Sequence, residues 1–183
     1  MSAAVPPEIE RVLISEQEIA DKVAELAAAV DADYVGRELL LVGVLKGAVM
    51  FMADFTRALR TPAAMEFMAV SSYGSATSSS GVVRILKDLD RDIADKHVLV
   101  VEDIIDSGLT LNWLLRNISS RSPASVEVVA LLRKPEAAKV DIPVKYVGFD
   151  IPSEFVVGYG LDYGEHYRGL PFLGLLKPEV YSR

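Results

Sequence analysis

The sequence predicts an α/β fold in which helices flank a mostly parallel central sheet. Apolar stretches short enough for buried strands alternate along the 183 residues with stretches that have helical spacing. His97–Val101 is the clearest strand, because its apolar residues suit a strand covered on both faces. Ser15 and Glu18 mark the clearest helix start, a capping box that apolar residues follow at helical spacing. Neither a repeat nor a linker divides the chain, so we expect one domain over residues 1–183.

The other elements are expected from the same two kinds of spacing. The first helix should end near Asp31–Tyr34, and further strands are expected at Glu38–Leu45, Met65–Ser71, Val82–Leu86 and Val126–Leu132, with shorter β segments at Val144–Phe149 and Phe155–Val157. A second helix should open at Gly47 and end before Pro62, and a third should carry Leu111, Leu114, Leu115 and Ile118. Ligands of such sheets bind beyond the carboxyl ends of the strands, so the segments after the strands are the candidate sites.

Charge and cysteine content exclude several functions. Lys and Arg number 19 and Asp and Glu 26, which gives a net charge of −7 (19 − 26) and a pI near 4.9. An acidic chain of this kind is a poor nucleic-acid binder, so we expect no nucleic-acid partner. The chain has no cysteine, which excludes disulfides, thiolate catalysis and thiolate metal sites, and is typical of a cytoplasmic protein.

Hydropathy indicates a second copy of the chain rather than a membrane as the partner. The longest apolar run, Leu39–Leu45, is far shorter than the roughly 20 residues of a membrane-spanning helix, so we expect no membrane association. The mean hydropathy of +0.28 is nevertheless high for a chain without such a span. Oligomers bury additional apolar surface, so we expect a homodimer or homotetramer.

The segment from Val98 to Thr110 carries the most chemistry. An apolar strand leads into a run of acidic, hydroxyl-bearing and small residues, which includes Glu102, Asp103, Asp106, Ser107, Gly108 and Thr110. The N-terminus of the helix that follows offers backbone N–H groups and the positive end of its dipole, and the hydroxyls add donors, all of which suit a phosphate. The two adjacent carboxylates can accept hydrogen bonds from sugar hydroxyls. The loop could therefore hold a ribose 5-phosphate, although the same residues also suit an ordinary strand, turn and capped helix.

The whole string resembles the phosphoribosyl-pyrophosphate signature of the purine phosphoribosyltransferases, and the resemblance extends to four further segments. Leu45-Lys46-Gly47 is similar to the family's pyrophosphate loop, in which the peptide before the lysine is commonly cis. Ser72-Tyr73-Gly74 and the serine-rich stretch after it resemble a mobile catalytic loop over about 71–81. Leu132-Arg133-Lys134 resembles the segment whose lysine contacts the exocyclic oxygen of the base. Phe155–Tyr163 is similar to the base site of the hypoxanthine-guanine phosphoribosyltransferases.

The resemblance implies a fold, a reaction and a cofactor. The fold is the type I phosphoribosyltransferase fold, with a small hood formed largely by residues 140–178 together with the N-terminal segment. The reaction is purine salvage, in which the phosphoribosyl group of phosphoribosyl pyrophosphate moves to N9 of a 6-oxopurine. Hypoxanthine then gives IMP, guanine gives GMP, and pyrophosphate is released. The cofactor is Mg²⁺.

The resemblance also implies a role for each matching residue. Asp106 is the catalytic acid or base. The phosphoribosyl group and its 5-phosphate contact Glu102, Asp103, Asp106, Ser107, Gly108, Leu109 and Thr110. The pyrophosphate group contacts Lys46, Gly47, Ser72, Tyr73 and Arg168. The base contacts Ile104, Lys134, Phe155, Val156, Leu161 and Asp162, and the metal ion contacts Glu102, Asp103 and Asp162.

Two alternative functions remain open on the sequence. A xanthine-preferring phosphoribosyltransferase shares these motifs. An RNA-binding regulator on the same fold would need a basic face, against which the acidic pI argues. An adenine or pyrimidine enzyme should lack Lys134 and the Phe155–Asp162 string.

Overall fold

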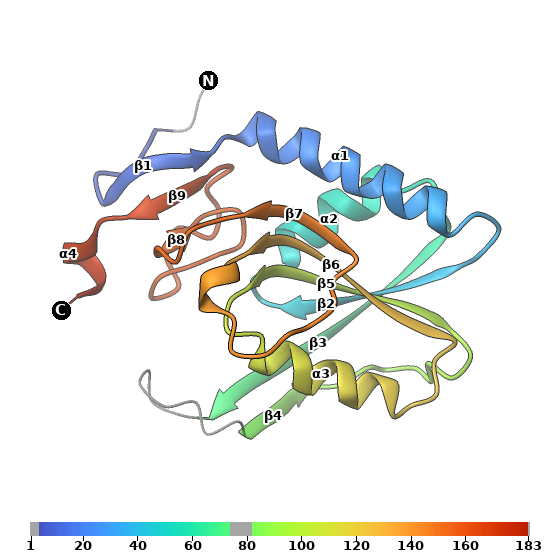
Figure 1. The fold of residues 1–183 in the computed structure, drawn as a ribbon. Helices are drawn as coiled ribbons and strands as arrows, with labels where there is room; N and C mark the ends of the chain where they lie inside the picture. Colours follow the sequence, from blue (N-terminus) through green and yellow to red (C-terminus); the bar gives the residue numbers. More distant parts are fainter. Residues whose placement is uncertain (1–3, 74–81, 183) are drawn as a thin grey trace.

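A six-stranded sheet forms the centre of the molecule (Figure 1). The computed structural model describes residues 4–73 and 82–182. The strands lie in the order β4-β3-β2-β5-β6-β7, and all neighbours are parallel except β4, which runs antiparallel to β3. Their bounds are β2 Leu39–Leu45, β3 Ala63–Tyr73, β4 Val82–Lys87, β5 His97–Ile105, β6 Ser125–Arg133 and β7 Tyr146–Asp150. The predicted mostly parallel sheet is confirmed.

Helices cover both faces of this sheet. α1 (Glu16–Asp33) and α2 (Val49–Ala58) lie on one face, and α3 (Leu109–Ser119) lies on the other (Figure 1). The central strand β5 is buried on both sides, because Leu99 and Val101 pack with α1 and α2 while Val98 and Val100 pack with α3. Among the described residues, no helix is both long enough and apolar enough to cross a membrane.

The capping box predicted at the start of α1 is present. Ser15 Oγ accepts a hydrogen bond from the Glu18 backbone N–H at 3.3 Å, and Glu18 Oε2 accepts one from the Ser15 N–H at 2.8 Å. These contacts satisfy two backbone donors that the helix itself leaves without acceptors. α1 consequently begins at Glu16 and extends along the sheet.

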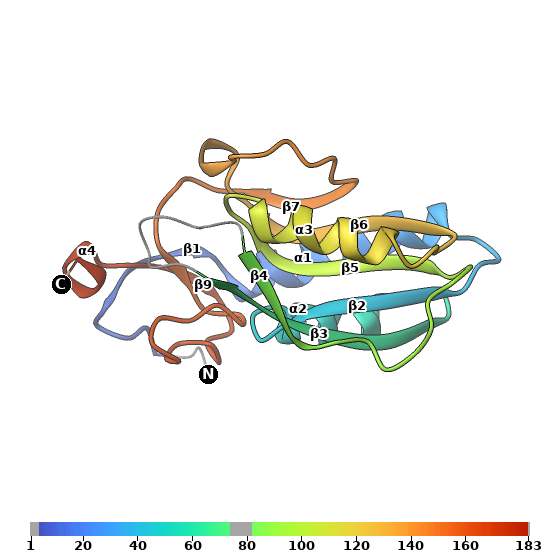
Figure 2. The ribbon, with the colours of Figure 1, turned by 90° about the horizontal axis from the view of Figure 1, so that it is seen from below.

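A second, three-stranded sheet lies beyond the carboxyl ends of the parallel strands (Figures 1 and 2). Its strands are antiparallel in the order β1-β9-β8, with bounds β1 Ile9–Ile14, β8 Val156–Val157 and β9 Leu173–Leu176. The short helix α4 (Pro178–Tyr181) follows β9, and a 3₁₀ turn, η1 (Pro135–Ala137), follows β6. We call the small sheet, together with residues 158–170 and α4, the hood. Strand β7 falls within the range expected for the hood, yet it is the edge strand of the large sheet.

Two strands extend at least two residues beyond their predicted carboxyl ends. β5 continues to Ile105, so the expected strand end at Val101 is wrong, because pairing with β6 extends through Ile105↔Arg133. β3 continues to Tyr73, where it pairs with Val82 of β4. Residues 71–73 of the expected mobile loop therefore belong to a strand. Residues 74–81 lie outside the described residues.

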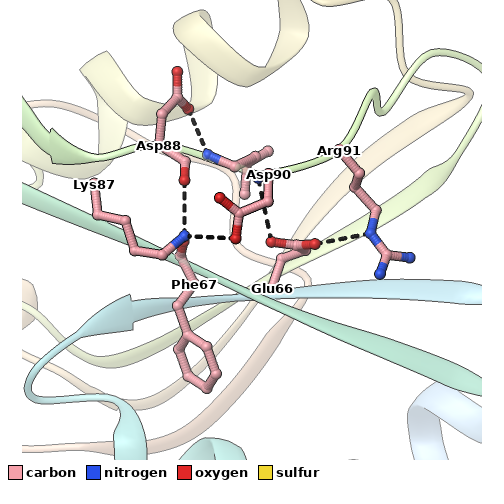
Figure 3. A network of polar contacts seen from close by, with 7 residues as sticks. Glu66, Phe67, Lys87, Asp88, Asp90 and Arg91 are labelled. Carbon is pink, nitrogen blue, oxygen red and sulfur yellow. Dashed lines mark hydrogen bonds and ion pairs between the residues drawn. The ribbon is translucent and has the colours of Figure 1, made fainter.

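A polar network fixes the base of the β3–β4 pair (Figure 3). Lys87 Nζ donates to the carbonyl oxygens of Phe67 and Asp88 at 3.2 and 2.9 Å and to Asp90 Oδ2 at 3.2 Å. Next to it, the buried carboxylate of Glu66 accepts a hydrogen bond from Arg91 Nε at 2.8 Å. A buried carboxylate is stable only when it is paired in this way. The network thereby attaches the end of edge strand β4 to β3.

Candidate active site

The predicted site residues come from loops at one edge of the large sheet and from the hood. Lys46 and Gly47 follow β2, Asp106 follows β5, and Lys134 follows β6. These strands are parallel, so their carboxyl ends meet at the same edge. The hood lies over that edge (Figure 1). The site is therefore a consequence of the sheet topology.

Glycines allow the loop after β2 to touch both β5 and the hood. A Cβ on Gly47 would overlap Asp103 Oδ2, and a Cβ on Gly160 would overlap the carbonyl oxygen of Gly47. Gly160 also has a φ of +99°, which side chains rarely tolerate. The peptide bond between Leu45 and Lys46 is cis, as the resemblance implies. The segment expected to form the pyrophosphate loop is thus packed between Asp103 and the hood.

Arg168 organises the hood side of this contact. Its Nη1 donates to the Gly160 carbonyl oxygen at 2.6 Å, and its Nη2 lies 3.2 Å from Asp162 Oδ1 and 3.0 Å from Glu165 Oε1. The Arg168 side chain is only 19% exposed. Its position is therefore set by the hood backbone as well as by charge. The predicted pyrophosphate-binding arginine and the predicted metal-binding aspartate are ion-paired with each other.

Asp103 is a buried carboxylate at the centre of this cluster. Burial raises its pKa to about 6, and the negative charge of Asp162 acts in the same direction. The Ile104 N–H, which donates to Asp103 Oδ1 at 2.8 Å, and the Arg168 cation lower the pKa but do not compensate fully. Asp103 therefore carries a charge that the folded chain only partly neutralises.

Glu102 points to the other face of β5, as alternation along a strand requires. It lines a pocket of about 240 Å³ together with Val44, Val70, the loop Asp106–Gly108 and the first turn of α3. Burial raises the pKa of Glu102, and the neighbouring charge of Asp103 adds to the effect. The two adjacent carboxylates thus lie on opposite sides of β5. The resemblance implies metal and ribose contacts for both residues, and the structure places their side chains on opposite faces of β5.

The N-terminus of α3 borders the same pocket. Gly108 precedes the helix with a φ of +81°, and a Cβ there would press on Val140 and Ile142. Ser107 Oγ accepts a weak hydrogen bond from the Leu109 N–H at 3.4 Å. Thr110 and Leu111 in the first helical turn line the pocket. Backbone N–H groups in a first turn have no acceptor within the helix, so this pocket suits an anion.

Asp106 and Lys134 face each other beside the helix. Lys134 Nζ lies 3.6 Å from Asp106 Oδ2, and the Lys134 side chain is 12% exposed while that of Asp106 is 59% exposed. The Lys134 N–H donates to the Ile105 carbonyl oxygen at 2.9 Å, which fixes the end of β6 against the end of β5. Both residues also line a second pocket, of about 200 Å³. An exposed carboxylate beside a largely buried ammonium can exchange a proton with a bound ligand.

Among the hood residues assigned to the base, Phe155 lies in an aromatic cluster, whereas Val156 and Leu161 pack with the core on the α1 and α2 side of the sheet. The Phe155 ring stacks on Tyr181, with centroids 5.1 Å apart and planes at 25°, and meets Tyr163 edge to face at 5.6 Å. Val156 is buried in β8, where it pairs with Leu175, and Leu161 is bonded to Gly158 in a tight turn. Within the described ranges, hydrogen bonds and ion pairs do not join this cluster to Asp106 and Lys134.

The structure therefore brings most predicted residues into two groups. Lys46, Gly47, Asp103, Asp162 and Arg168 form one group, and Glu102, Asp106, Ser107, Gly108, Thr110 and Lys134 form the other. Ile104 lies between them. The backbone of Ser72 and Tyr73 ends β3.

Sequence analysis missed Glu165, which lies in the first group. Its Oε2 accepts a hydrogen bond from Lys46 Nζ at 2.9 Å, in addition to the contact with Arg168. The Lys46 ammonium is the main cause that holds the pKa of Glu165 below its usual range. The only signal in the sequence is an acidic residue close to Asp162 and Arg168, which by itself indicates nothing.

Asp103 and Asp162 are the residues best placed to hold a metal ion. Among the described residues, no three acidic or histidine side chains converge as a complete metal site. The two carboxylates nevertheless influence each other electrostatically, and carboxylate oxygens are ligands that Mg²⁺ prefers. Mg²⁺ is commonly bound by one or two carboxylates and completed by substrate phosphates and water, so the residues present fit it.

Comparisons with known proteins agree with this geometry. The family model of the phosphoribosyl transferase domain matches residues 13–164, and the chain belongs to the phosphoribosyltransferase family, a family of enzymes. A relative from Mycobacterium tuberculosis (strain ATCC 25618 / H37Rv), named hypoxanthine-guanine phosphoribosyltransferase, is 57% identical over 183 residues and is matched over 97% of this chain and 91% of its own length.

Solved structures show the same similarity. A hypoxanthine phosphoribosyltransferase from Staphylococcus aureus matches with a TM-score of 0.93 and 49% identity over 96% of both chains. A hypoxanthine phosphoribosyl transferase from Trypanosoma cruzi, studied for the role of its C-terminal region in oligomeric state and activity, matches with a TM-score of 0.93 and 44% identity over 98% of this chain and 97% of its own. The type I phosphoribosyltransferase fold is thus confirmed.

Proposed function

We propose that this chain is a purine salvage enzyme that transfers the phosphoribosyl group of phosphoribosyl pyrophosphate to N9 of hypoxanthine or guanine. The products are IMP or GMP and pyrophosphate. The observation that carries the proposal is the pairing of Lys134 with Asp106 beside the N-terminus of α3. A second pair of cations lies nearby, with Lys46 in the loop after β2 and Arg168 in the hood. The chain is 57% identical to a relative named for this activity.

The two ends of phosphoribosyl pyrophosphate need two anion sites, and the chain offers two. The 5-phosphate lies at the first turn of α3, where Ser107, Gly108, Leu109 and Thr110 offer backbone and hydroxyl donors. The pyrophosphate group lies against Lys46, Gly47 and Arg168. Glu102, on the α3 side of β5, accepts hydrogen bonds from the ribose hydroxyls.

Mg²⁺ is the cofactor of the proposed reaction, with Asp103 and Asp162 as its protein ligands. Asp103 and Asp162 would hold the ion, which would supply positive charge to the pyrophosphate leaving group. Lys46 and Arg168 stabilise the same leaving group through fixed positive charges. The expected catalytic loop over about 71–81 excludes water from the reactive carbon, which remains a prediction.

The group of residues that contains Asp106 and Lys134 recognises the base. Lys134 donates to the 6-oxo oxygen, and Asp106 accepts the proton from N7 as the bond between N9 and carbon 1 forms. Tyr181 covers one face of Phe155, so a purine stacks on the opposite face. Ile104 and Leu161 complete the apolar walls of the base site, and Val156 offers backbone groups to the edge of the base.

The proposal also concerns assembly and location. We expect a homodimer or homotetramer because the mean hydropathy is +0.28 and large apolar side chains such as Val35 and Leu86 are exposed. We expect a cytoplasmic location, which the absence of cysteine supports.

Asp106→Asn tests the proposed acid–base role. The substitution keeps the shape of the side chain but removes its ability to accept the N7 proton, so kcat for IMP formation should fall by roughly 10²–10⁴-fold with a smaller change in KM. The measurement is steady-state IMP formation from hypoxanthine and phosphoribosyl pyrophosphate with Mg²⁺. Asp21→Asn, which removes an exposed carboxylate on α1, is the control. Near-normal turnover of Asp106→Asn would show that another group accepts the proton.

A further inference from the structure

One carboxylate joins the two cations that the proposed function assigns to pyrophosphate. Glu165 Oε2 lies 2.9 Å from Lys46 Nζ, and Glu165 Oε1 lies 3.0 Å from Arg168 Nη2. Each oxygen thus contacts a different cation. Two oxygens of a phosphoryl group can contact the same two cations in the same manner. Glu165 consequently occupies the place where the pyrophosphate group is expected.

The backbone around Glu165 suggests that its side chain has a role. Tyr163 and His166 exchange two backbone hydrogen bonds, at 3.2 and 3.1 Å, which closes a two-residue hairpin. Both central residues have positive φ, +57° at Gly164 and +65° at Glu165, as in a type I′ turn. Glycine and asparagine are favoured at these positions, whereas a glutamate there is strained. A strained residue whose side chain contacts a binding site justifies a functional hypothesis.

The turn also directs the side chain toward the two cations. The Glu165 N–H donates to Asp162 Oδ2 at 2.9 Å, which ties the turn to the proposed metal ligand. Arg168, three residues further on, is held by the Gly160 carbonyl oxygen. Lys46 has no comparable support, because its side chain is 66% exposed and Glu165 is the partner that the described residues give it.

We propose that Glu165 is an internal placeholder for pyrophosphate, an inference that rests on the proposed function. In the substrate-free chain its carboxylate pairs Lys46 with Arg168 and keeps the Lys46 side chain at the site. When pyrophosphate or the diphosphate end of the substrate binds, the carboxylate is displaced. The pair can exchange readily, because both Lys46 and Glu165 are about two-thirds exposed, at 66% and 64%, and exposed ion pairs are weak.

A placeholder lowers the affinity for the ligand that it imitates. Pyrophosphate must break the two Glu165 contacts before it can bind Lys46 and Arg168. Because the Glu165 carboxylate is 64% exposed, solvent weakens both of its ion pairs, and removal of the carboxylate should tighten pyrophosphate binding by roughly 3- to 10-fold. Glu165 is thus a positioning residue that also favours product release.

The test is the dissociation constant of inorganic pyrophosphate with Mg²⁺, measured by titration calorimetry on four full-length chains. Glu165→Gln removes the charge and keeps the size, and Glu165→Gly removes the charge and also relieves the left-handed turn. Glu10→Gln, at an exposed position on β1, controls for the change in net charge. We expect both Glu165 variants to bind pyrophosphate roughly 3- to 10-fold more tightly than the wild-type chain and Glu10→Gln to bind it unchanged.

Each other outcome overturns the inference in a distinguishable way. Unchanged or weaker binding by Glu165→Gln would show that the carboxylate does not compete with the ligand. Tighter binding by Glu165→Gly alone would mean that turn geometry, rather than charge, sets the affinity. A wild-type chain that binds no pyrophosphate would contradict the proposed function itself and this inference with it.

Discussion

At the scale of one residue, Asp103 shows that the site contains a buried carboxylate whose ionised form is unfavourable. Its pKa is raised from 3.8 to about 6 by burial, so between these pH values the folded chain binds a proton that the unfolded chain has lost. The stability that this proton supplies is present below pH 4 and is lost as the pH rises through 6. At neutral pH the ionised Asp103 therefore destabilises the substrate-free chain, and a cation bound there would reverse the effect.

Asp103→Asn should be more stable than the wild-type chain at pH 7.5. The shift of 6 − 3.8, or about 2 pKa units, corresponds to at most about 3 kcal/mol, and the advantage should disappear near pH 4. Urea unfolding at the two pH values measures it, with Asp21→Asn as the control for loss of an exposed carboxylate. A variant that is less stable than the wild-type chain at pH 7.5 would show that Arg168 compensates the Asp103 charge fully.

The residues of the candidate site show which features can be predicted from the sequence and which cannot. Lys46, Asp106 and Lys134 are predicted as site residues because each lies in a string that resembles a known motif, and Arg168 because it falls where the family has an arginine. Glu165 was missed, since its role depends on two cations that the fold brings together from positions 119 and 3 residues away in the chain. The opposite directions of Glu102 and Asp103 were missed because hydrogen bonding to β6 prolongs the strand beyond its apolar residues.

Among the elements, the strands and helices of the large sheet could be predicted because their burial gives each one a clear pattern of apolar residues. β1 and β9 of the hood could not, since they pair with each other across the length of the chain and β1 contains irregular pairing that breaks alternation. Their four to six residues are stabilised by the partner strand rather than by local preference. The hood is consequently the least predictable part of the fold, although it supplies Asp162, Glu165 and Arg168.

Gly160→Ala tests the contact between the hood and the loop after β2. Gly160 has a φ of +99°, and an added Cβ would overlap the Gly47 carbonyl oxygen, so the hood loop must move. Gly36→Ala is the matched control, because Gly36 has a φ of +72° but nothing within 4 Å of the added Cβ. We expect Gly36→Ala to cost about 1 kcal/mol of unfolding free energy and Gly160→Ala to cost clearly more.

The same pair of variants separates strain from function. The affinity for pyrophosphate should fall at least tenfold in Gly160→Ala, because Arg168 is held by the Gly160 carbonyl oxygen, and it should not change in Gly36→Ala. Calorimetry and urea unfolding give the two quantities. Equal effects of the two substitutions would mean that Gly160 does not pack against the Gly47 carbonyl oxygen as described.

At the scale of the whole molecule, the net charge of −7 has the same sign as the polyanionic substrate. Screening over about 8–10 Å leaves local charges in control, and the site places Lys46, Lys134 and Arg168 where the phosphates and the base are expected. Each of these three cations is paired with a carboxylate in the substrate-free chain, so the phosphates and the base meet fixed positive groups within an acidic protein. The net negative charge favours solubility, and the local cations determine binding.

The homo-oligomer expected from hydropathy is tested by light scattering coupled to size-exclusion chromatography. Apolar surface that is exposed in a single chain should be covered by a second copy, so the mass should be two or four times the 19.9 kDa of one chain. The measurement is made over a hundredfold range of concentration. A monomer at every concentration would contradict the expectation.

In the proposed function, Lys134 and Asp106 select a 6-oxopurine. Pyrophosphate release measured with hypoxanthine, guanine, xanthine, adenine and a pyrimidine base tests this selection. An ammonium is only a donor, so it favours the 6-oxo group and opposes the 6-amino group of adenine by roughly 10⁴-fold or more in kcat/KM. Lys134→Met should reduce this preference more than it changes the affinity for phosphoribosyl pyrophosphate. We predict rapid release with hypoxanthine and guanine, slower release with xanthine and almost none with adenine. Equal use of adenine and hypoxanthine by the wild-type chain would contradict the base site described, and a marked preference for xanthine would replace the proposed substrate.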